Sequence, residues 1–145
     1  NHMSCAFCNI ISNDAPALFV AEQERVVAFM DINPLSEGHV LVVPRAHEAH
    51  WTQLENRDAA ALMICAQEIG HAMQKTFEDV AGVNLLANEG QAAGQEVLHA
   101  HIHVIPRRPV DGIRFGMGDP RVERSPESFQ KNAEHIRSNL YGETG

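Results

Sequence analysis

The stretch His99-Ala100-His101-Ile102-His103-Val104-Ile105 decides how this chain is interpreted, because three histidines alternate with small or apolar residues. Alternate side chains of a β-strand point to one face of the sheet, roughly 6.5–7 Å apart. The pattern predicts a strand over residues 99–106, with the three histidines on one face and the intervening residues facing a core. Imidazole titrates near neutral pH and seeks partners, so three in register indicate a functional surface more than a solvated strand face.

The length and composition predict one domain. The chain has 145 residues, of which 44% are hydrophobic, enough for a sizeable core. We place a single domain at residues 4–145, because Asn1-His2 before Met3 is typical of an expression scar. Residues 108–145 are expected to be a variable C-terminal loop and helix, with a mobile loop over 110–123.

Charge and cysteine usage exclude some classes of function. The formal net charge of −8 argues against a nucleic-acid surface, which needs a basic patch. No apolar run approaches the roughly 20 residues that span a bilayer, and no signal-peptide pattern precedes the domain, so no membrane partner is expected. The cysteine count is three, an odd number, which favours a reduced, cytoplasmic setting.

The remaining pattern predicts an α+β fold. Strands are expected at 18–22, 26–31, 38–44 and 83–88, besides the histidine strand, and a short helix or turn at 5–13. Thr52 and Glu55 form a capping-box pattern at the start of an amphipathic helix. Ser125-Pro126 begins a second helix at the C-terminus. Short turns favour a five-stranded antiparallel sheet with two main helices, and its edges favour pairing into a dimer.

The histidine stretch suits phosphorus chemistry. A neutral imidazole held in one tautomer is a nucleophile that can take up a phosphoryl group, which water then removes. The bend at 94–97 begins with Gly94, and successive backbone N–H groups of such a bend can hold a phosphate. A glycine in a loop is by itself ordinary turn chemistry, so this bend gains weight only from the histidines beside it.

Gly94-Gln95-Glu96-Val97-Leu98-His99-Ala100-His101-Ile102-His103-Val104-Ile105-Pro106-Arg107 resembles the signature of the histidine triad (HIT) superfamily of nucleotide hydrolases and transferases. In that signature, three histidines alternate with apolar residues after a Gly-Gln bend. The segments 29–34 and 38–44 resemble the N-terminal half of the same family, so the likeness covers roughly residues 5–107. The resemblance implies a HIT-like fold.

The resemblance also implies roles for individual residues. His101 would be the nucleophile, His103 would hydrogen-bond a phosphate oxygen, and His39 would lie beneath the active site. Asp31 would take the ribose hydroxyls, although it could instead cap the turn at 33–34. The purine would lie against apolar side chains, and the phosphate or leaving group would meet a polar loop; the two sets are Phe7, Ile10, Phe29 and Ile32, and Asn88, Gly94, Gln95, Glu96 and Val97.

Glu96 departs from the family pattern, in which many members carry Ser or Thr at this position. An ionised carboxylate cannot donate a hydrogen bond to a leaving group and would repel a polyphosphate. We expect Glu96 either to point away from the phosphate or to favour a cationic leaving group such as an amine.

Cys5 and Cys8 form a C-x₂-C pair, which is compatible with a zinc site, a redox pair or two small buried side chains. Some branches of the superfamily carry a structural zinc. By that likeness the ligands are Cys5, Cys8, His47 and His99, with His50 as the alternative to His47. Zinc would then pin the N-terminus against the histidine strand.

The sequence therefore predicts a homodimeric hydrolase that cleaves purine nucleoside phosphoramidates, or related nucleoside phosphate derivatives, through a nucleotidyl-His101 intermediate. A dinucleoside polyphosphate hydrolase is the first alternative, with Arg107 or Arg108 reaching a distal phosphate. A nucleotide-binding regulatory protein with little turnover, and a zinc-stabilised interaction module, are alternatives of other classes. No catalytic cofactor is expected.

Overall fold

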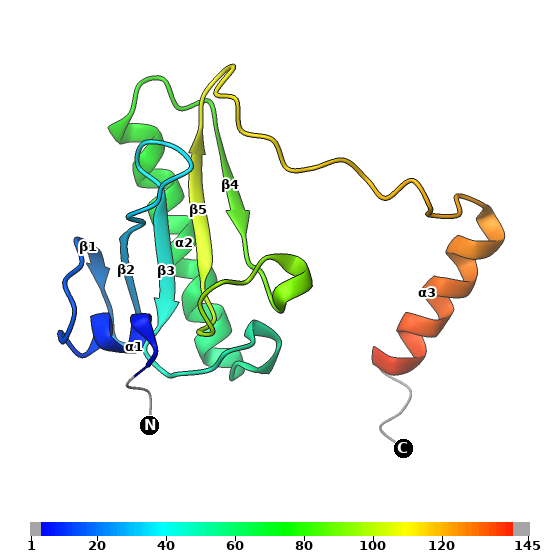
Figure 1. Ribbon diagram of the computed structural model, residues 1–145, viewed down its shortest axis with the longest axis horizontal. Helices are drawn as coiled ribbons and strands as arrows, with labels where there is room; N and C mark the ends of the chain where they lie inside the picture. Colours follow the sequence, from blue (N-terminus) through cyan, green and yellow to red (C-terminus); the bar gives the residue numbers. More distant parts are fainter. Residues whose placement is uncertain (1–3, 141–145) are drawn as a thin grey trace. The chain divides into compact units, whose positions relative to one another are not determined.

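The computed structural model describes residues 4–140 and contains a five-stranded antiparallel sheet. Its strands follow the order β1-β2-β3-β5-β4 (Figure 1). Their bounds are β1 Phe19–Glu22, β2 Val26–Met30, β3 Val40–Pro44, β4 Gly82–Leu86 and β5 Ile102–Arg107. The predicted α+β fold with five antiparallel strands is confirmed. The predicted scar at 1–3 and the end of the chain at 141–145 lie outside the described residues.

Three α-helices and two 3-10 turns accompany the sheet in the described part of the chain. The helices are α1 Ala6–Ile11, α2 Asn56–Thr76 and α3 Pro126–Leu140, and the turns are η1 Trp51–Gln53 and η2 Gln91–Ala93. The oxygen of Ser125 accepts the Ser128 N–H at 3.1 Å, which confirms the predicted N-cap of α3. The helix α2 is too polar to cross a membrane, and none of the other described helices could cross one either.

The larger core lies between the sheet and α2, which runs along one face of the sheet (Figure 1). From the helix, the predicted apolar stripe supplies Leu62, Cys65, Ile69 and Met73. From the strands, Val42 and Val104 are fully buried against it. Apolar residues recur about every 3.6 positions along α2 and at every second position along the strands. The apolar side of the helix therefore packs on one face of the sheet, which becomes the core.

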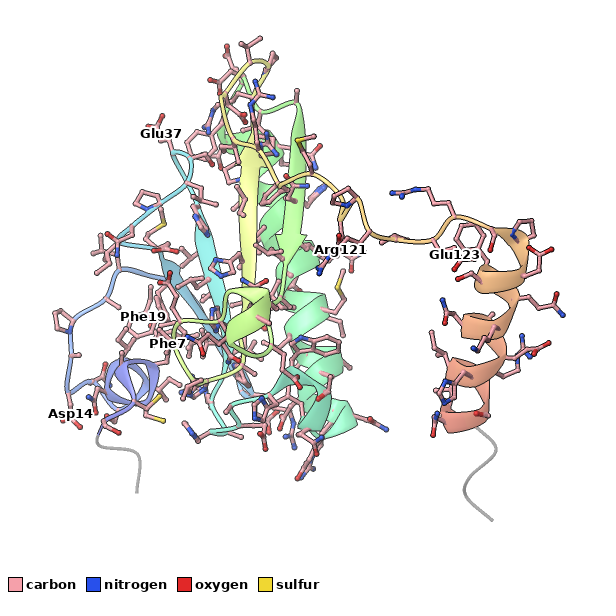
Figure 2. The ribbon with its side chains drawn as sticks, turned by 45° about the vertical axis from the view of Figure 1, so that its right-hand side comes forward. Phe7, Asp14, Phe19, Glu37, Arg121 and Glu123 are labelled. Carbon is pink, nitrogen blue, oxygen red and sulfur yellow. The ribbon has the colours of Figure 1, made fainter. Side chains whose placement is uncertain are left out.

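The opposite face of the sheet carries a second apolar cluster under α1. Phe7 of α1, labelled in Figure 2, packs with the inward residues Val27, Phe29 and Leu41 of β2 and β3. The Phe7 and Phe29 rings meet edge to face with their centroids 5.5 Å apart. This face receives His103 as well, because His103 pairs with Leu41 across the ladder.

The predicted histidine strand begins later than expected. The strand β5 starts at Ile102, so His99 and His101 precede the ladder and only His103 lies within it. The backbone before Ile102 is engaged elsewhere, since Ala100 N–H donates to the Glu48 carbonyl at 2.6 Å. The strand is therefore shorter than predicted, but the three histidines do share one face: the Phe7 ring contacts those of His99 and His101, and the His101 ring contacts that of His103. Ile102 and Val104 point to the core as predicted.

The predicted start of the long helix was also wrong. Thr52 lies in η1 and Glu55 is the residue before the first turn of α2, with no side-chain capping bond. The Thr52 N–H and hydroxyl both donate to the Glu89 carboxylate instead, each at 2.9 Å. Thr52 thus hydrogen-bonds Glu89, which is distant in the sequence, in place of the backbone N–H of Glu55 that the Thr-x-x-Glu pattern predicts.

The chain divides into two compact units, with the boundary in the sequence after Ile113. The first unit holds the sheet, α1 and α2. The second begins at Arg114 and holds α3, none of whose residues is buried. The predicted loop over 110–123 contains neither helix nor strand.

Candidate functional site

His101 is held in one orientation by the residue two positions before it. Its Nδ1 lies 2.6 Å from the His99 carbonyl oxygen, which can only accept, so Nδ1–H is the donor. In the neutral ring, Nε2 then carries the free lone pair. Burial lowers the pKa of His101, against the opposing effects of the His99 carbonyl and Asp31, and so favours that neutral form. The ring also meets Phe7 edge to face at 5.0 Å.

His39 and His103 form a hydrogen-bonded pair beside His101. His39 Nδ1 accepts the Leu35 N–H at 3.0 Å, so the neutral ring carries its proton on Nε2. That Nε2 lies 3.0 Å from His103 Nδ1, which must accept, and the His103 proton is placed on Nε2. Burial, followed by the neighbouring His101 and His39, lowers the pKa of His103 to about 4. The chain of contacts thus presents a neutral N–H donor at His103.

Asp31 caps the turn at 33–34, one of the two functions that the sequence left open, and its second oxygen lies beside the histidine pair. Its Oδ1 accepts the Asn33 N–H at 2.8 Å and so closes the turn after β2. Its Oδ2 lies 3.4 Å from His39 Nε2 and 4.0 Å from His103 Nδ1. A half-buried carboxylate is therefore present at the histidine pair, where it can accept hydrogen bonds from hydroxyl groups.

The four apolar residues predicted to contact a purine lie in different environments. Phe7 and Phe29 are buried and Ile10 packs beside them. Ile32 is 88% exposed and stands apart from this cluster. The structure thus brings the first three together beside His101 and leaves Ile32 at the surface.

The loop between β4 and the histidines is closed by the side chain of Gln95. The Gln95 carbonyl oxygen accepts the Gly90 N–H at 2.8 Å, and its NH₂ donates to the carbonyls of Ala49 at 2.7 Å and Val97 at 3.1 Å. These contacts are all within the protein, so Gln95 shapes the loop. Gly94 has a φ of +94°, which a residue with a Cβ adopts only under strain.

Asn88 lies at the start of the same loop. Its Nδ2 would be 3.6 Å from a Cβ placed on Gly94, so the amide lies over that glycine. The β4–β5 register pairs Leu86 with His103, and its continuation would place Asn88 opposite His101. The register thus brings Asn88 beside His101, next to β5.

A second cluster joins Cys5, Cys8, His47 and His99, whose ligand atoms all lie within 4.8 Å of one another. Nδ1 of His99 is 3.4 Å from Cys5 Sγ and 3.6 Å from Cys8 Sγ, and Nδ1 of His47 is 3.2 Å from Cys8 Sγ. Tetrahedral zinc bound to one nitrogen and one sulfur would separate these atoms by about 3.5 Å. These four residues can hold a metal.

Two further contacts prepare this cluster. His99 Nε2 donates to the Pro44 carbonyl at 2.9 Å, which leaves Nδ1 as the acceptor that faces the sulfurs. Burial is the first cause that raises the pKa of Cys8 to about 11, so the free thiol is protonated and a bound cation would have to displace its proton. The alternative ligand His50 lies outside the cluster, with its Nδ1 3.8 Å from the Glu89 carboxylate.

Glu96 lines a surface hollow of about 490 Å³ on the same side as the metal cluster. The other lining residues are Ser4, Cys5, Ala6, His47, Val97 and Leu98. Glu96 is exposed, and neither His101 nor His103 lines this hollow. The hollow therefore borders the metal cluster and not the histidine pair.

Arg107 and Arg108 are both engaged within the protein. Arg107 forms a two-pronged pair with Asp111, at 2.7 and 2.8 Å, and its pKa is raised by that carboxylate. Arg108 donates to Asp79 at 3.1 Å and to the Glu37 carbonyl at 2.9 Å. The arginines are occupied by structural contacts, which does not favour the idea that they bind a distal phosphate.

Sequence reasoning missed two features of this site. The Leu35 N–H and the Pro44 carbonyl fix the tautomers of His39 and His99, and backbone groups leave no signal in a sequence pattern. Glu89 and Thr52 join the loop to the segment after His47. The Thr52 signal was present but indicated a helix cap.

The fold and the site together define a small α+β protein with a buried histidine cluster on one face of the sheet, over β3 and β5, and a Cys/His metal-type cluster beside it. A family model described as the HIT domain matches residues 12–110. The chain belongs to the HIT family, as the sequence resemblance predicted.

Curated relatives and solved structures agree with this assignment. The chain is 35% identical, over 95% of its length and 99% of the relative's, to a Schizosaccharomyces pombe protein named adenosine 5'-monophosphoramidase. A crystal structure of a HIT family member from Bacillus subtilis superposes with a TM-score of 0.85 at 35% identity, over 92% of this chain and 95% of that one. A zinc-bound histidine triad family protein from Mycobacterium smegmatis gives 0.75 at 35% identity, over 96% and 99%.

Proposed function

We propose that this protein is a nucleotide hydrolase that cleaves purine nucleoside phosphoramidates through a nucleotidyl-His101 intermediate and releases a nucleoside monophosphate. The observation that carries the proposal is the 2.6 Å contact between His101 Nδ1 and the His99 carbonyl. It holds the proton on Nδ1, so the Nε2 lone pair of the neutral ring is the nucleophile. The carbonyl would also stabilise the positive ring that forms when Nε2 bonds to phosphorus.

The proposed reaction has two displacement steps. In the first, His101 Nε2 forms a bond to phosphorus, the P–N bond breaks, and the amine leaves with a proton taken from solvent. In the second, water attacks phosphorus and gives up a proton to solvent, the electrons of the breaking P–Nε2 bond return to Nε2, and the nucleoside monophosphate leaves with neutral His101 restored. His103 Nε2–H would donate to a phosphoryl oxygen in both steps, since His39 holds its proton on that nitrogen.

The rest of the nucleotide is assigned by chemistry. The second carboxylate oxygen of Asp31, beside the histidine pair, suits ribose hydroxyl donors. Phe7, Phe29 and Ile10 offer an apolar wall for a base, and Ile32 would join it only when a ligand covers it. Asn88, Gly94 and the backbone of Glu96 and Val97 would meet the phosphate, while Gln95 shapes their loop.

We propose zinc as the ion of the second cluster, with Cys5, Cys8, His47 and His99 as its ligands. Zinc favours mixed thiolate and imidazole sets, and a relative of the same fold is described as zinc-bound. The ion would be structural, tying the N-terminus to the residues just before β5. His99 would then be a ligand and take no part in proton transfer.

A dinucleoside polyphosphate hydrolase is the alternative that the structure supports less. The engaged Arg107 and Arg108 argue against a second phosphate site there. A name that specifies phosphoramidase activity for a relative of nearly the same length also favours phosphoramidates. We further propose a homodimer in a reducing, cytoplasmic setting, in keeping with sheet edges at β1 and β4 and unpaired cysteines.

The test is the release of AMP from an adenosine phosphoramidate and, in parallel, from diadenosine tetraphosphate. His101→Ala should lower kcat at least about a thousandfold for both substrates and still bind AMP. His71→Ala, a change at an exposed histidine, should match the wild type. The ratio of the two wild-type rates identifies the substrate class. Tight AMP binding without turnover by the wild type would instead support a regulatory binding protein.

A further inference from the structure

The loop that follows β4 is attached to the rest of the protein through the carboxylate of Glu89. The Thr52 N–H donates to Glu89 Oε1 and the Thr52 hydroxyl donates to Oε2, each at 2.9 Å. His50 Nδ1 lies 3.8 Å from the same Oε2. Both carboxylate oxygens are therefore used, a geometry that fixes direction as well as distance.

The segment that holds Glu89 is itself fixed at several points. Residues 48–52 directly follow His47 of the metal cluster, and the Glu48 carbonyl accepts the Ala100 N–H at 2.6 Å. The Ala49 carbonyl accepts from Gln95 at 2.7 Å. Segment 48–52 thus forms a support to which both ends of the loop, at Glu89 and at Gln95, are attached.

Gln95 fixes the far end of the loop and its contact with Gly90, and Glu89 is the side chain that attaches the near end to segment 48–52. Gly90 and Gly94 have φ values of +89° and +94°, and its exposed turn η2 buries no side chain. Glycine-rich backbone of this kind can adopt many conformations unless other groups restrain it. Asn88 immediately precedes Glu89 and its amide lies over Gly94, so the place of Asn88 depends on the position of Glu89.

We propose that Glu89 is a positioning residue whose paired hydrogen bonds with Thr52 hold Asn88 and loop 90–97 against the phosphate of a nucleotide at His101. The proposal rests on the proposed hydrolase function. Glu89 touches neither the substrate nor the reacting atoms; it acts through the backbone that it anchors. The Thr52 contacts lower the pKa of Glu89, in keeping with a carboxylate that remains ionised in this role.

Glu89→Ala removes both hydrogen bonds to Thr52, Thr52→Val removes only the one from the hydroxyl, and Thr52→Ser retains both. We expect Glu89→Ala to lower kcat/KM for the phosphoramidate at least tenfold and to weaken AMP binding by a similar factor, and Thr52→Val to lower both by a smaller factor. Thr52→Ser should stay within twofold of the wild type. The double variant should be no worse than Glu89→Ala alone, since the Thr52 hydroxyl acts only through Glu89.

Glu55→Gln is the matched control. Glu55 is an exposed carboxylate between Thr52 and α2, and within the described part of the chain its side chain forms an ion pair with Arg57. A general loss of stability would lower kcat/KM only in proportion to the unfolded fraction and would leave the AMP affinity of the folded fraction unchanged. If Glu89→Ala keeps both kcat/KM and AMP affinity within twofold of the wild type, the proposal is overturned.

Hydrogen exchange at the amides of residues 90–97 gives a readout that needs no ligand. Exchange should speed up at least tenfold in Glu89→Ala, by a smaller factor in Thr52→Val, and remain slow in Thr52→Ser. Unchanged exchange would overturn the positioning role. A wild type that neither binds AMP nor cleaves the phosphoramidate would refute the proposed function, and in that case the exchange rates alone would decide whether Glu89 holds the loop.

Discussion

Nε2 of His39 lies 3.0 Å from Nδ1 of His103, although the two residues are 64 positions apart in the chain. The Leu35 N–H on the other nitrogen of His39 decides the direction of this bond. A backbone donor in a turn thus determines which nitrogen of His103 carries a proton, and that nitrogen is the one proposed to donate to the phosphate.

Replacing His39 should therefore affect turnover through His103. His39→Leu removes the donor and should lower kcat at least tenfold. His39→Gln should stay within about fivefold, because its amide can accept the Leu35 N–H and donate to His103. Steady-state kcat and KM for an adenosine phosphoramidate are the measurement. Equal loss in both variants would show that side-chain volume matters and hydrogen bonding does not.

The metal cluster predicts a loss of zinc and stability in one set of variants. Purified protein should contain about one zinc per chain, and Cys8→Ser or His47→Gln should reduce this below about 0.2 and lower Tm by about 10 °C. His50→Gln should retain the metal, since His50 lies outside the cluster. Elemental analysis and calorimetry decide the point. Metal-free wild type that is fully folded would reject the site.

Glu96 should influence the choice of leaving group. Glu96→Ser removes a negative charge from the loop and supplies a hydroxyl, so kcat/KM for diadenosine tetraphosphate should rise at least about fivefold relative to that for the phosphoramidate. Glu22→Ser, which removes a carboxylate at an exposed strand position, is the control. An unchanged ratio of the two rates would show that Glu96 has no part in leaving-group preference.

Gln95 should be important for stability because its buried amide satisfies three backbone groups. Gln95→Ala leaves the Ala49 and Val97 carbonyls and the Gly90 N–H without this partner. The expected cost is about 2–4 kcal/mol in the free energy of unfolding. Gln91→Ala, at an exposed position of the same loop, should change it by less than about 0.5 kcal/mol. Urea denaturation measures both; similar values for the two variants would contradict the assignment.

The histidine cluster also predicts a pH dependence of stability. Burial lowers the pKa values of His39, His101 and His103 in the folded state, that of His103 to about 4. Below about pH 6.5 the unfolded chain then binds more protons than the folded one, so stability is fully present above that pH and is lost as the pH falls toward about 4.

His103→Asn, which retains the metal cluster, should show a shallower loss in urea denaturation between pH 7.5 and pH 5. Parallel curves for the variant and the wild type would contradict the contribution of His103.

The sequence by itself determined the fold class, because a two-residue period at 102–104 and a 3.6-residue period in α2 are local patterns that each select a face. The resemblance to the HIT signature also identified the members of both clusters, whereas the C-x₂-C pair alone left several interpretations open.

Only the tertiary structure decided which nitrogen of each histidine carries the proton, because the deciding partners are backbone groups of Leu35, His99 and Pro44. The tertiary structure also places His47, and not His50, in the metal cluster. Thr52 hydrogen-bonds Glu89 and does not cap a helix. These choices depend on contacts between segments far apart in the chain, which no local pattern encodes.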